Sequence, residues 1–250
     1  IQMIGEGILK NPEPLAIFGQ HVCPALPPGK VGFRPGKYMA SSDEIYITVK
    51  GKGGHAATPH QNIDPVVIGA QILLALQQLI SRETDPTLPT VLSFGKFIAN
   101  GQTNIIPDEA RLEGTLRTFD ETWRHEMHSR IENVVTSTAN AFGANCEIFI
   151  DHGYPNLQND ESLTREAIQS AKEFLGNENV VELDQRMTAE DFAYYAQKVP
   201  GCFYRLGVAH SNLPFASLHS AHFDVDENCL LTGPALMAWL ALKKLDPNLR

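Results

Sequence analysis

The chain has 250 residues, of which 43% are hydrophobic and 20% are charged. This is an ordinary globular composition, long enough for one large domain or two modest ones. The formal net charge is −9 and no segment is rich in Lys and Arg, which argues against nucleic acid as a main partner. No apolar run of membrane length and no signal peptide stand out, so the default expectation is a cytoplasmic protein that is not embedded in a membrane.

The first twelve residues predict a helix that lacks its usual start. Ile1, Ile4, Ile8 and Leu9 have helical spacing, but no Ser, Thr, Asp or Asn precedes them as a cap. We therefore expect a helix that closes near 11–12, and we expect that an upstream portion of the protein is missing from this sequence.

A short strand is predicted next, followed by a flexible connection. The strand covers Leu15–Phe18, and the Pro/Gly-rich stretch 24–36 is a plausible hinge between two units. His21 follows the strand at a position where enzymes with open α/β sheets often place functional residues.

The segment 41–152 has regular alternating patterns. The stretch 44–53 alternates as a strand, and Asp64 with Pro65 marks the start of a helix through 66–81 that is apolar on most sides and is expected to be well buried. Further elements are expected as strands 90–99 and 109–118, a helix from Asp120 to Gly143, and a strand 145–151. The order β-α-β-β-α-β predicts a ferredoxin-like unit.

The remainder of the chain alternates helices and short apolar strands. Helices are expected at 161–175, 189–197 and 234–245, and strands at 180–183 and 202–207. This pattern predicts an α/β layer with a mostly parallel sheet. We therefore expect a smaller domain (41–152) inserted into a larger α/β domain formed by 1–40 and 153–250.

Three groups of histidines are candidates for metal binding, although a single histidine is more often structural. They are His21, the pair His55 and His60, and the pair His219 and His222. The glycine-rich stretch around His55 lacks the GxxxxGK[ST] spacing of a phosphate loop, so its simplest interpretation is a turn.

Other motifs favour structural interpretations. Thr188 and Asp191 fit a capping-box-like helix start rather than a catalytic acid pair. Cys23 lies two residues after His21, so a local His/Cys metal pair is an alternative to a packed cysteine, which we favour. Four widely spaced cysteines without a CxxC pair predict neither a disulfide framework nor a zinc ribbon, and no GxSxG motif supports a serine nucleophile.

Several stretches together resemble the zinc-dependent aminoacylase/carboxypeptidase superfamily, in its branch of hippurate hydrolases, indole-acetyl-amino-acid hydrolases and N-acyl-amino-acid deacetylases. The stretches are 2-QMIGEGIL-9, 17-IFGQHVCP-24, 50-KGKGGHAATPH-60 with 63-IDPV-66, 104-NIIPDEARLEGTLRTFD-120, 190-EDFAYY-195 with 199-VPGCFYRLG-207, and 218-LHSAHF-223. The resemblance implies a zinc-peptidase-like α/β catalytic domain, here its C-terminal part, with an inserted lid domain that often mediates dimerisation.

The resemblance also implies site residues and a reaction. His21 and His219 match metal ligands of a site that holds two divalent ions such as zinc or manganese. His55 matches a lid histidine that helps polarise the scissile carbonyl in a partner's site, and Asn104 and Arg117 match substrate-contacting positions. The family's Cys-x-His pair and its general-base glutamate have no counterpart here, and neither Glu6 nor Glu190 occupies the matching place.

The function that follows is metal-dependent hydrolysis of the amide bond in N-acyl amino acids, with a small-molecule substrate and a homodimer formed through the lid. Because ligands are missing, we expect this stretch alone to be an inactive fragment. Alternatives are an aminopeptidase or dipeptidase of the same superfamily, a non-catalytic binding or dimerisation module, and a truncated product without function.

Overall fold

The computed structural model describes residues 1–210, 217–246, 248 and 249, and divides them into two compact units. Unit 1 comprises Ile1–Met39, Leu157–Arg186 and the described part of Glu190–Arg250. Unit 2 comprises Ala40–Asn156 and Met187–Ala189. Each unit has its own hydrophobic core, and each is described separately below.

Unit 1 is built on a four-stranded sheet in the order β1-β12-β2-β11. Its strands are β1 (Ile17–Cys23), β2 (Val31–Phe33), β11 (Val180–Glu182) and β12 (Gly201–Gly207). The pairs β1/β12 and β2/β11 are parallel, whereas β12/β2 is antiparallel. The α/β class is confirmed, and the sheet is mixed, with two parallel strand pairs and one short antiparallel pair. Seven residues between β1 and β2 are too few for a crossover, so β2 runs antiparallel to β1, on the other side of β12.

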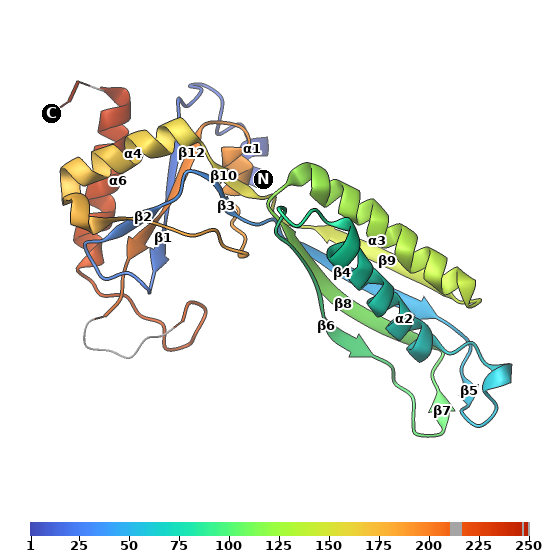
Figure 1. Ribbon diagram of the computed structural model, residues 1–250. Helices are drawn as coiled ribbons and strands as arrows, with labels where there is room; N and C mark the ends of the chain where they lie inside the picture. The colour runs from blue at the N-terminus through green and yellow to red at the C-terminus, as the bar shows by residue number, and fades with distance from the viewer. Residues whose placement is uncertain (211–216, 247, 250) are drawn as a thin grey trace. The chain divides into compact units, whose positions relative to one another are not determined.

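Helices cover one face of this sheet, as Figure 1 shows. Side chains of α4 (Glu161–Leu175) and α6 (Cys229–Leu245) pack with Cys202, Tyr204 and Leu206 of β12. Alternate residues of a strand point to opposite faces, so Phe203 faces the other way, into a smaller cluster with Tyr38 and Phe192. The β12 strand is buried along its whole length.

Three predictions of local structure in the first part of unit 1 need correction. The first helix, α1 (Gln2–Gly5), is a single turn that ends well before the predicted 11–12, because Gly7 takes a positive φ of 90° and ends the helical path. His21 lies inside β1 rather than after it, because β1 follows β12 beyond the predicted end at Phe18. The stretch 24–36 contains β2 and the start of β3 (Gly36–Met39), which pairs with β10 (Leu157–Asn159).

The last two helices also differ from expectation. The helix expected at 189–197 is the short α5 (Ala193–Ala196), and Thr188 does not cap it. Instead, the Asp191 amide donates to the side chain of Glu190 at 3.2 Å. Helix α6 begins five residues earlier than expected and contains Pro234, because burial of Cys229 in the core stabilises the extra turn.

Unit 2 is an antiparallel four-stranded sheet with two helices on one face (Figure 1). The elements run β4 (Asp43–Lys50), α2 (Pro65–Gln78), β6 (Thr90–Ile98), β8 (Glu109–Thr118), α3 (Glu121–Ala141) and β9 (Asn145–His152). The sheet order is β6-β8-β4-β9, so the first and third strands of the β-α-β-β-α-β sequence lie side by side at the centre.

The local signals of unit 2 act as the sequence predicts. Asp64 accepts hydrogen bonds from the amides of Val66 and Val67 at the start of α2. Asp120 accepts from the Trp123 amide at the start of α3, and Gly143 ends that helix with a φ of 76°. These caps fix both helix starts over the core face of the sheet.

Helix α2 is less buried than its composition suggests. Ile68, Ile72 and Leu76 face the core, but Val67 is 57% and Leu74 is 65% exposed. With the following π-turn η2 (Leu79–Glu83) it is long and apolar enough to cross a membrane by length and composition, contrary to expectation. Its buried face packs against the sheet as in a core helix of a globular unit.

Candidate functional site

The first candidate site lies near the carboxyl ends of the parallel strands β1 and β12 in unit 1. His21 and Arg205 are direct partners in the register of the two strands. Residues paired in register carry their side chains on the same face of a sheet, only about 5 Å apart at the backbone. The imidazole and the guanidinium therefore share one face at the sheet end where open α/β proteins bind ligands.

The ring of His21 has one nitrogen fixed by the backbone. Its Nδ1 lies 2.8 Å from the carbonyl oxygen of Val22. A carbonyl only accepts hydrogen bonds, so Nδ1 carries the proton and Nε2 keeps its lone pair in the neutral ring. A second ring contact, edge-on to Phe203 with centroids 6.3 Å apart, limits rotation of the ring. This is the arrangement in which an imidazole is ready to bind a metal through Nε2.

Arg205 is a buried cation, with 2% of its surface exposed. Its Nε donates to the Tyr38 hydroxyl at 2.9 Å and its Nη2 contacts the Met39 sulfur at 3.3 Å. The guanidinium also lies over the rings of Tyr38 and Phe203. Within the part of the chain that the structure describes, no carboxylate lies within ion-pair distance of it. Aromatic faces and neutral acceptors therefore stabilise its charge.

The carboxyl of Glu190 interacts electrostatically with both His21 and Arg205. Burial raises the pKa of its half-buried carboxyl, and the charge of Asp191 adds to the increase, while His21 and Arg205 act in the opposite direction. From the sequence, Glu190 was expected to belong to a helix start formed by Thr188 and Asp191 and not to occupy the catalytic place. The available signal that Glu190 faces the sheet was the aromatic residue two positions later, Phe192, which is buried.

His219 lies in an exposed turn of the loop after β12. It has a φ of 66°, a conformation that non-glycine residues adopt rarely and that often marks functional positions. His222 is also exposed, and its amide donates to the Ser220 hydroxyl. No hydrogen bond or ring contact joins His219 to His21 among the described residues.

The described residues do not assemble a complete metal centre. Across 1–210, 217–246, 248 and 249, no group of three or more His, Cys, Asp or Glu side chains could hold an ion. Cys23 is buried, in keeping with the packed interpretation. Burial raises the pKa of Cys146 to about 11 and that of Cys202 to about 12, so both thiols are protonated at neutral pH and poor as ligands or nucleophiles.

The second candidate site is the exposed loop of unit 2 that carries His55. This residue pairs with Ile105 in the two-stranded sheet of β5 (Gly54–His55) and β7 (Ile105–Ile106). Its Nδ1 accepts a hydrogen bond from the Ala57 amide at 3.0 Å, so in the neutral ring Nε2 carries the proton. The Asn62 side chain donates to the His55 carbonyl at 3.1 Å and braces the loop.

Asn104 lies beside His55, but Arg117 does not. The Asn104 carbonyl accepts from the Ala56 amide at 3.0 Å, and its side chain is exposed. Arg117 lies eight residues beyond Glu109 along β8, about 26 Å at the rise of a strand, toward the opposite end of the sheet. His60 is also exposed, near the 3₁₀ turn after His55.

A buried ionic network in unit 2 was not anticipated from the sequence. Asp43 has no exposed surface and accepts two hydrogen bonds from Arg124, at 2.5 and 2.8 Å, and one from His128 at 2.8 Å. Arg124 also donates to Glu121 at 2.9 Å. Arg124 and His128 lie more than 80 residues after Asp43 in the sequence, so no local pattern could reveal their pairing with it.

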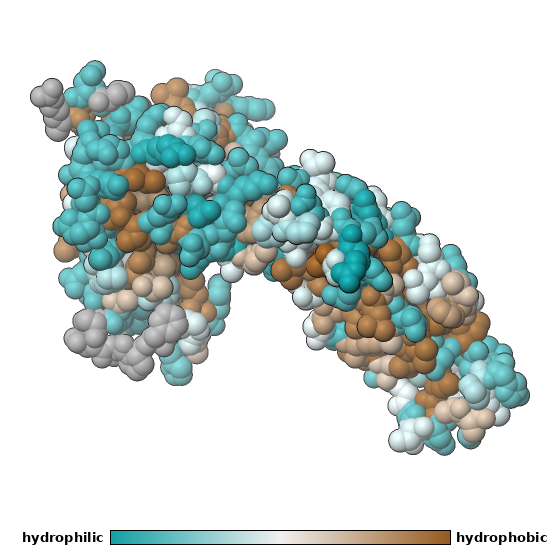
Figure 2. Space-filling view, viewed as in Figure 1, coloured by the Kyte–Doolittle hydropathy of each residue, from teal (hydrophilic) through white to brown (hydrophobic). Residues whose placement is uncertain are grey.

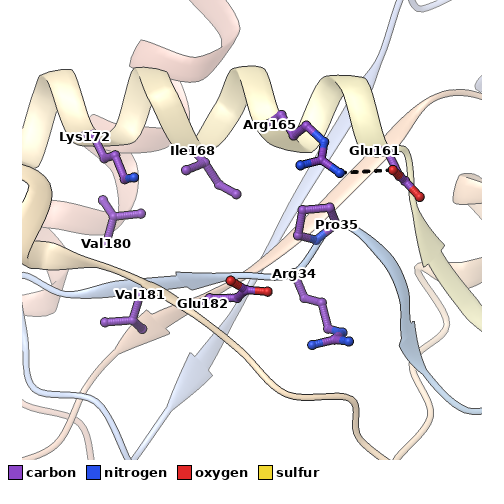
Figure 3. A pocket seen from close by; sticks show the side chains of 9 residues that line it. All are labelled: Arg34, Pro35, Glu161, Arg165, Ile168, Lys172, Val180, Val181 and Glu182. Atoms are coloured by element: carbon purple, nitrogen blue, oxygen red, sulfur yellow. Dashed lines mark hydrogen bonds and ion pairs between the residues drawn. The ribbon is translucent and has the colours of Figure 1, made fainter.

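Two pockets accompany these elements. One, of about 370 Å³, lies between α4 and β11 of unit 1. Figure 3 shows Arg165 and Glu161 of α4 paired at its rim, with Arg34 and Glu182 opposite. A larger groove of about 700 Å³ lies along β6, β7 and β8 in unit 2. None of the predicted site residues lines either pocket.

The mixed sheet with helices on one face and the separate antiparallel unit define an α/β protein with a histidine at the carboxyl end of a parallel strand pair. The chain belongs to the peptidase family M20/M25/M40, whose family model matches residues 1–243. This confirms the resemblance identified from the sequence motifs.

Individual relatives are consistent with this assignment. The chain is 36% identical to IAA-amino acid hydrolase ILR1-like 4 of Arabidopsis thaliana, over 98% of this chain and 56% of that protein. It is also 36% identical to N-acetyldiaminopimelate deacetylase of Brevibacillus brevis, over 91% of this chain and 60% of the relative. The crystal structure of Bacillus subtilis YXEP, described as a dinuclear metal-binding peptidase of the M20 family, superposes with a TM-score of 0.78 at 31% identity, over 98% of this chain and 61% of that one. The chain thus spans about three fifths of the length of these relatives.

Proposed function

We propose that this chain is part of a metal-dependent amidohydrolase that cleaves the amide bond of N-acyl amino acids of the hippurate or N-acetyl-amino-acid type. The observation that carries the proposal is the geometry of His21, whose Nδ1–H is held by the Val22 carbonyl so that Nε2 is free to bind a metal. The relatives named as an IAA-amino acid hydrolase and an N-acetyldiaminopimelate deacetylase support the choice of substrate class.

His21 and His219 are the residues that would hold metal in this proposal. Both offer imidazole nitrogen, a donor that suits zinc and related divalent ions. Two protein ligands fall short of the three that a catalytic zinc site uses, so they supply a part of the ligand set. When bound, one or two divalent ions would lower the pKa of a water molecule and polarise the amide carbonyl.

His55 would act on the substrate's carbonyl oxygen. Because the Ala57 amide donates to Nδ1, neutral His55 presents Nε2–H, which is the form needed to donate a hydrogen bond to a developing oxyanion. Asn104 on the neighbouring segment offers a second donor, and Arg117 would pair with the substrate's carboxylate through two parallel hydrogen bonds.

The separation of these groups favours a partner subunit. His55 and Arg117 are too far apart within one copy of unit 2 to hold one small N-acyl amino acid. We propose that unit 2 is the inserted lid, that it forms a homodimer, and that His55 serves the partner's site. The apolar stripe of α2 with Val67 and Leu74 is the surface we assign to the dimer, and Figure 2 shows apolar residues gathered on this part of unit 2.

The test uses the complete enzyme that contains this chain. Purified protein is assayed with N-acetyl and N-benzoyl amino acids and with dipeptides, and its bound metal is counted. We expect turnover of the N-acyl substrates, with loss of activity and of bound metal in His21→Ala but not in the control His60→Ala. Preference for dipeptides with free amino termini would instead establish an aminopeptidase or dipeptidase.

A non-catalytic binding or dimerisation module is the second candidate. It is favoured by the lack, within the described residues, of any group of three metal-binding side chains. Metal analysis of this 250-residue chain after exposure to zinc or manganese separates the two ideas. Stoichiometric tight metal together with turnover by this chain would exclude the second candidate.

A further inference from the structure

Arg117 differs from the other basic residues on the open face of the unit 2 sheet, which is the face without helices. Among the described residues, three basic side chains on this face form ion pairs with neighbouring carboxylates. The pairs are Lys50–Glu147, Lys96–Glu113 at 2.6 Å and Arg111–Glu109 at 2.6 Å. Arg117 is half-buried and has no carboxylate within ion-pair distance in the described part of the chain.

A single hydrogen bond fixes the guanidinium of Arg117. Its Nε donates to the Thr115 hydroxyl at 3.2 Å, two residues away on the same face of β8. Nη1 and Nη2 have no partner among the described residues. Because Nε is the nitrogen engaged, the remaining free edge of the guanidinium is its end-on fork, which matches the two oxygens of a carboxylate.

Thr115 is itself held in a defined role. Its hydroxyl has one proton, which it donates to the Asp43 carbonyl oxygen at 2.9 Å. The hydroxyl must therefore accept the bond from Arg117 rather than donate to it. Asp43 in turn cannot shift, because its buried carboxylate is held by Arg124 and His128. Hydrogen bonds to the side chain and to the main chain of Asp43 thus connect the core of unit 2 with Arg117.

We propose that Thr115 and Asp43 are positioning residues that hold Arg117 ready to bind the carboxylate of the substrate's amino-acid portion. This inference rests on the proposed function. An arginine side chain loses rotamer freedom when it is fixed, and a site that fixes it before binding avoids that cost. The set of hydrogen bonds makes the enzyme selective for free carboxylates over their amides.

The experiment compares hippurate with hippuramide, which lacks the carboxylate, using the complete enzyme. Thr115→Val keeps the shape of the side chain and the strand propensity but removes both hydrogen bonds. We expect its preference for the acid, measured as a ratio of kcat/KM values, to fall about 3- to 10-fold, through a higher KM for hippurate with unchanged kcat. Thr115→Ser, which keeps the hydroxyl, restores the preference, and Arg117→Ala abolishes it.

Thr48→Val is the matched control, because Thr48 is a half-buried threonine on the same sheet face with no side-chain hydrogen bond in the described structure. It should leave the preference unchanged. Full preference in Thr115→Val but not in Arg117→Ala would overturn this inference and leave the proposed function intact. Full preference in Arg117→Ala would overturn this inference and also the role of Arg117 in binding the substrate's carboxylate. No hydrolysis of any N-acyl amino acid by the wild-type enzyme would overturn the proposed function, and this inference with it.

Discussion

Replacement of Asp43 by asparagine should destabilise unit 2 strongly at neutral pH. The change leaves the charge of Arg124, of which 4% is exposed, without the carboxylate that accepts two of its hydrogen bonds. Removal of one member of a buried ion pair typically costs about 3–5 kcal/mol, because the remaining charge stays buried. We expect a loss of that size in the free energy of unfolding at pH 7.

The same variant predicts how stability depends on pH. Burial by itself raises the pKa of Asp43, but the hydrogen bonds and charges of Arg124 and His128 outweigh it and lower the pKa from 3.8 to about 2. A carboxyl with a lowered pKa in the folded state stabilises the fold above its unfolded pKa, and this contribution disappears as the pH falls toward the folded pKa. The difference between 3.8 and about 2 corresponds to about 2.4 kcal/mol.

The assay uses the two tryptophans of the chain, which lie one in each unit. Trp239→Phe leaves Trp123, in the core of unit 2, as the fluorescent reporter of urea unfolding. Unfolding free energies are measured from pH 7 to pH 3. The gap between wild type and Asp43→Asn should narrow by about half of the 2.4 kcal/mol by pH 3.

Two results would refute this reasoning. One is a loss below about 1 kcal/mol at pH 7, within the range of an ordinary surface change. The other is an equal dependence on pH in wild type and Asp43→Asn between pH 5 and pH 3. Asp151→Asn, which removes an exposed carboxylate from the neighbouring strand β9, is the matched control and should change stability by no more than about 0.5 kcal/mol.

Three further outcomes are expected. Leu74→Glu on α2 should convert the proposed dimer to monomers in sedimentation velocity, whereas Leu231→Glu, at the still more exposed start of α6, should not. An unchanged dimer in Leu74→Glu would locate the interface elsewhere. His55→Ala in the complete enzyme should lower kcat by about 10²- to 10³-fold with KM little changed, and equal loss in His60→Ala would argue against a specific role. Cys146 should react slowly with iodoacetamide at pH 8, because burial raises its pKa to about 11; alkylation as fast as free cysteine, measured by mass spectrometry, would contradict this.

Local chemistry was sufficient to predict most of unit 2 from the sequence. Asp64 and Asp120 cap the helices that they were expected to cap, and the strict alternation of β4 gives the burial pattern of a half-buried strand. The predictions failed where contacts with residues distant in the sequence determine the structure. The length of β1 depends on pairing with β12, which lies about 180 residues later, and the start of α6 depends on the burial of Cys229.

In the candidate site, too, some features could be predicted from the sequence and others depend on contacts that the sequence does not reveal. Resemblance identified His21, His55 and Arg117, but no pattern in the sequence indicated what holds each of them. The backbone acceptor of His21 is adjacent in sequence, yet it acts only because the strand conformation of β1 turns the ring toward it. The support of Arg117 runs through Asp43, 72 residues from Thr115, and only the register of β4 with β8 brings them together.

In His21 and His55, the backbone partner of Nδ1 determines what the other ring nitrogen can do. In His21 a carbonyl oxygen meets Nδ1, so the far nitrogen offers a lone pair. In His55 an amide N–H meets Nδ1, so the far nitrogen offers a proton. The same side chain is thereby prepared as an electron-pair donor in unit 1 and as a hydrogen-bond donor in unit 2. Exchange of these roles would require a different backbone partner at each ring, which is why a histidine's neighbours, and not its presence alone, determine which of its nitrogens can donate or accept.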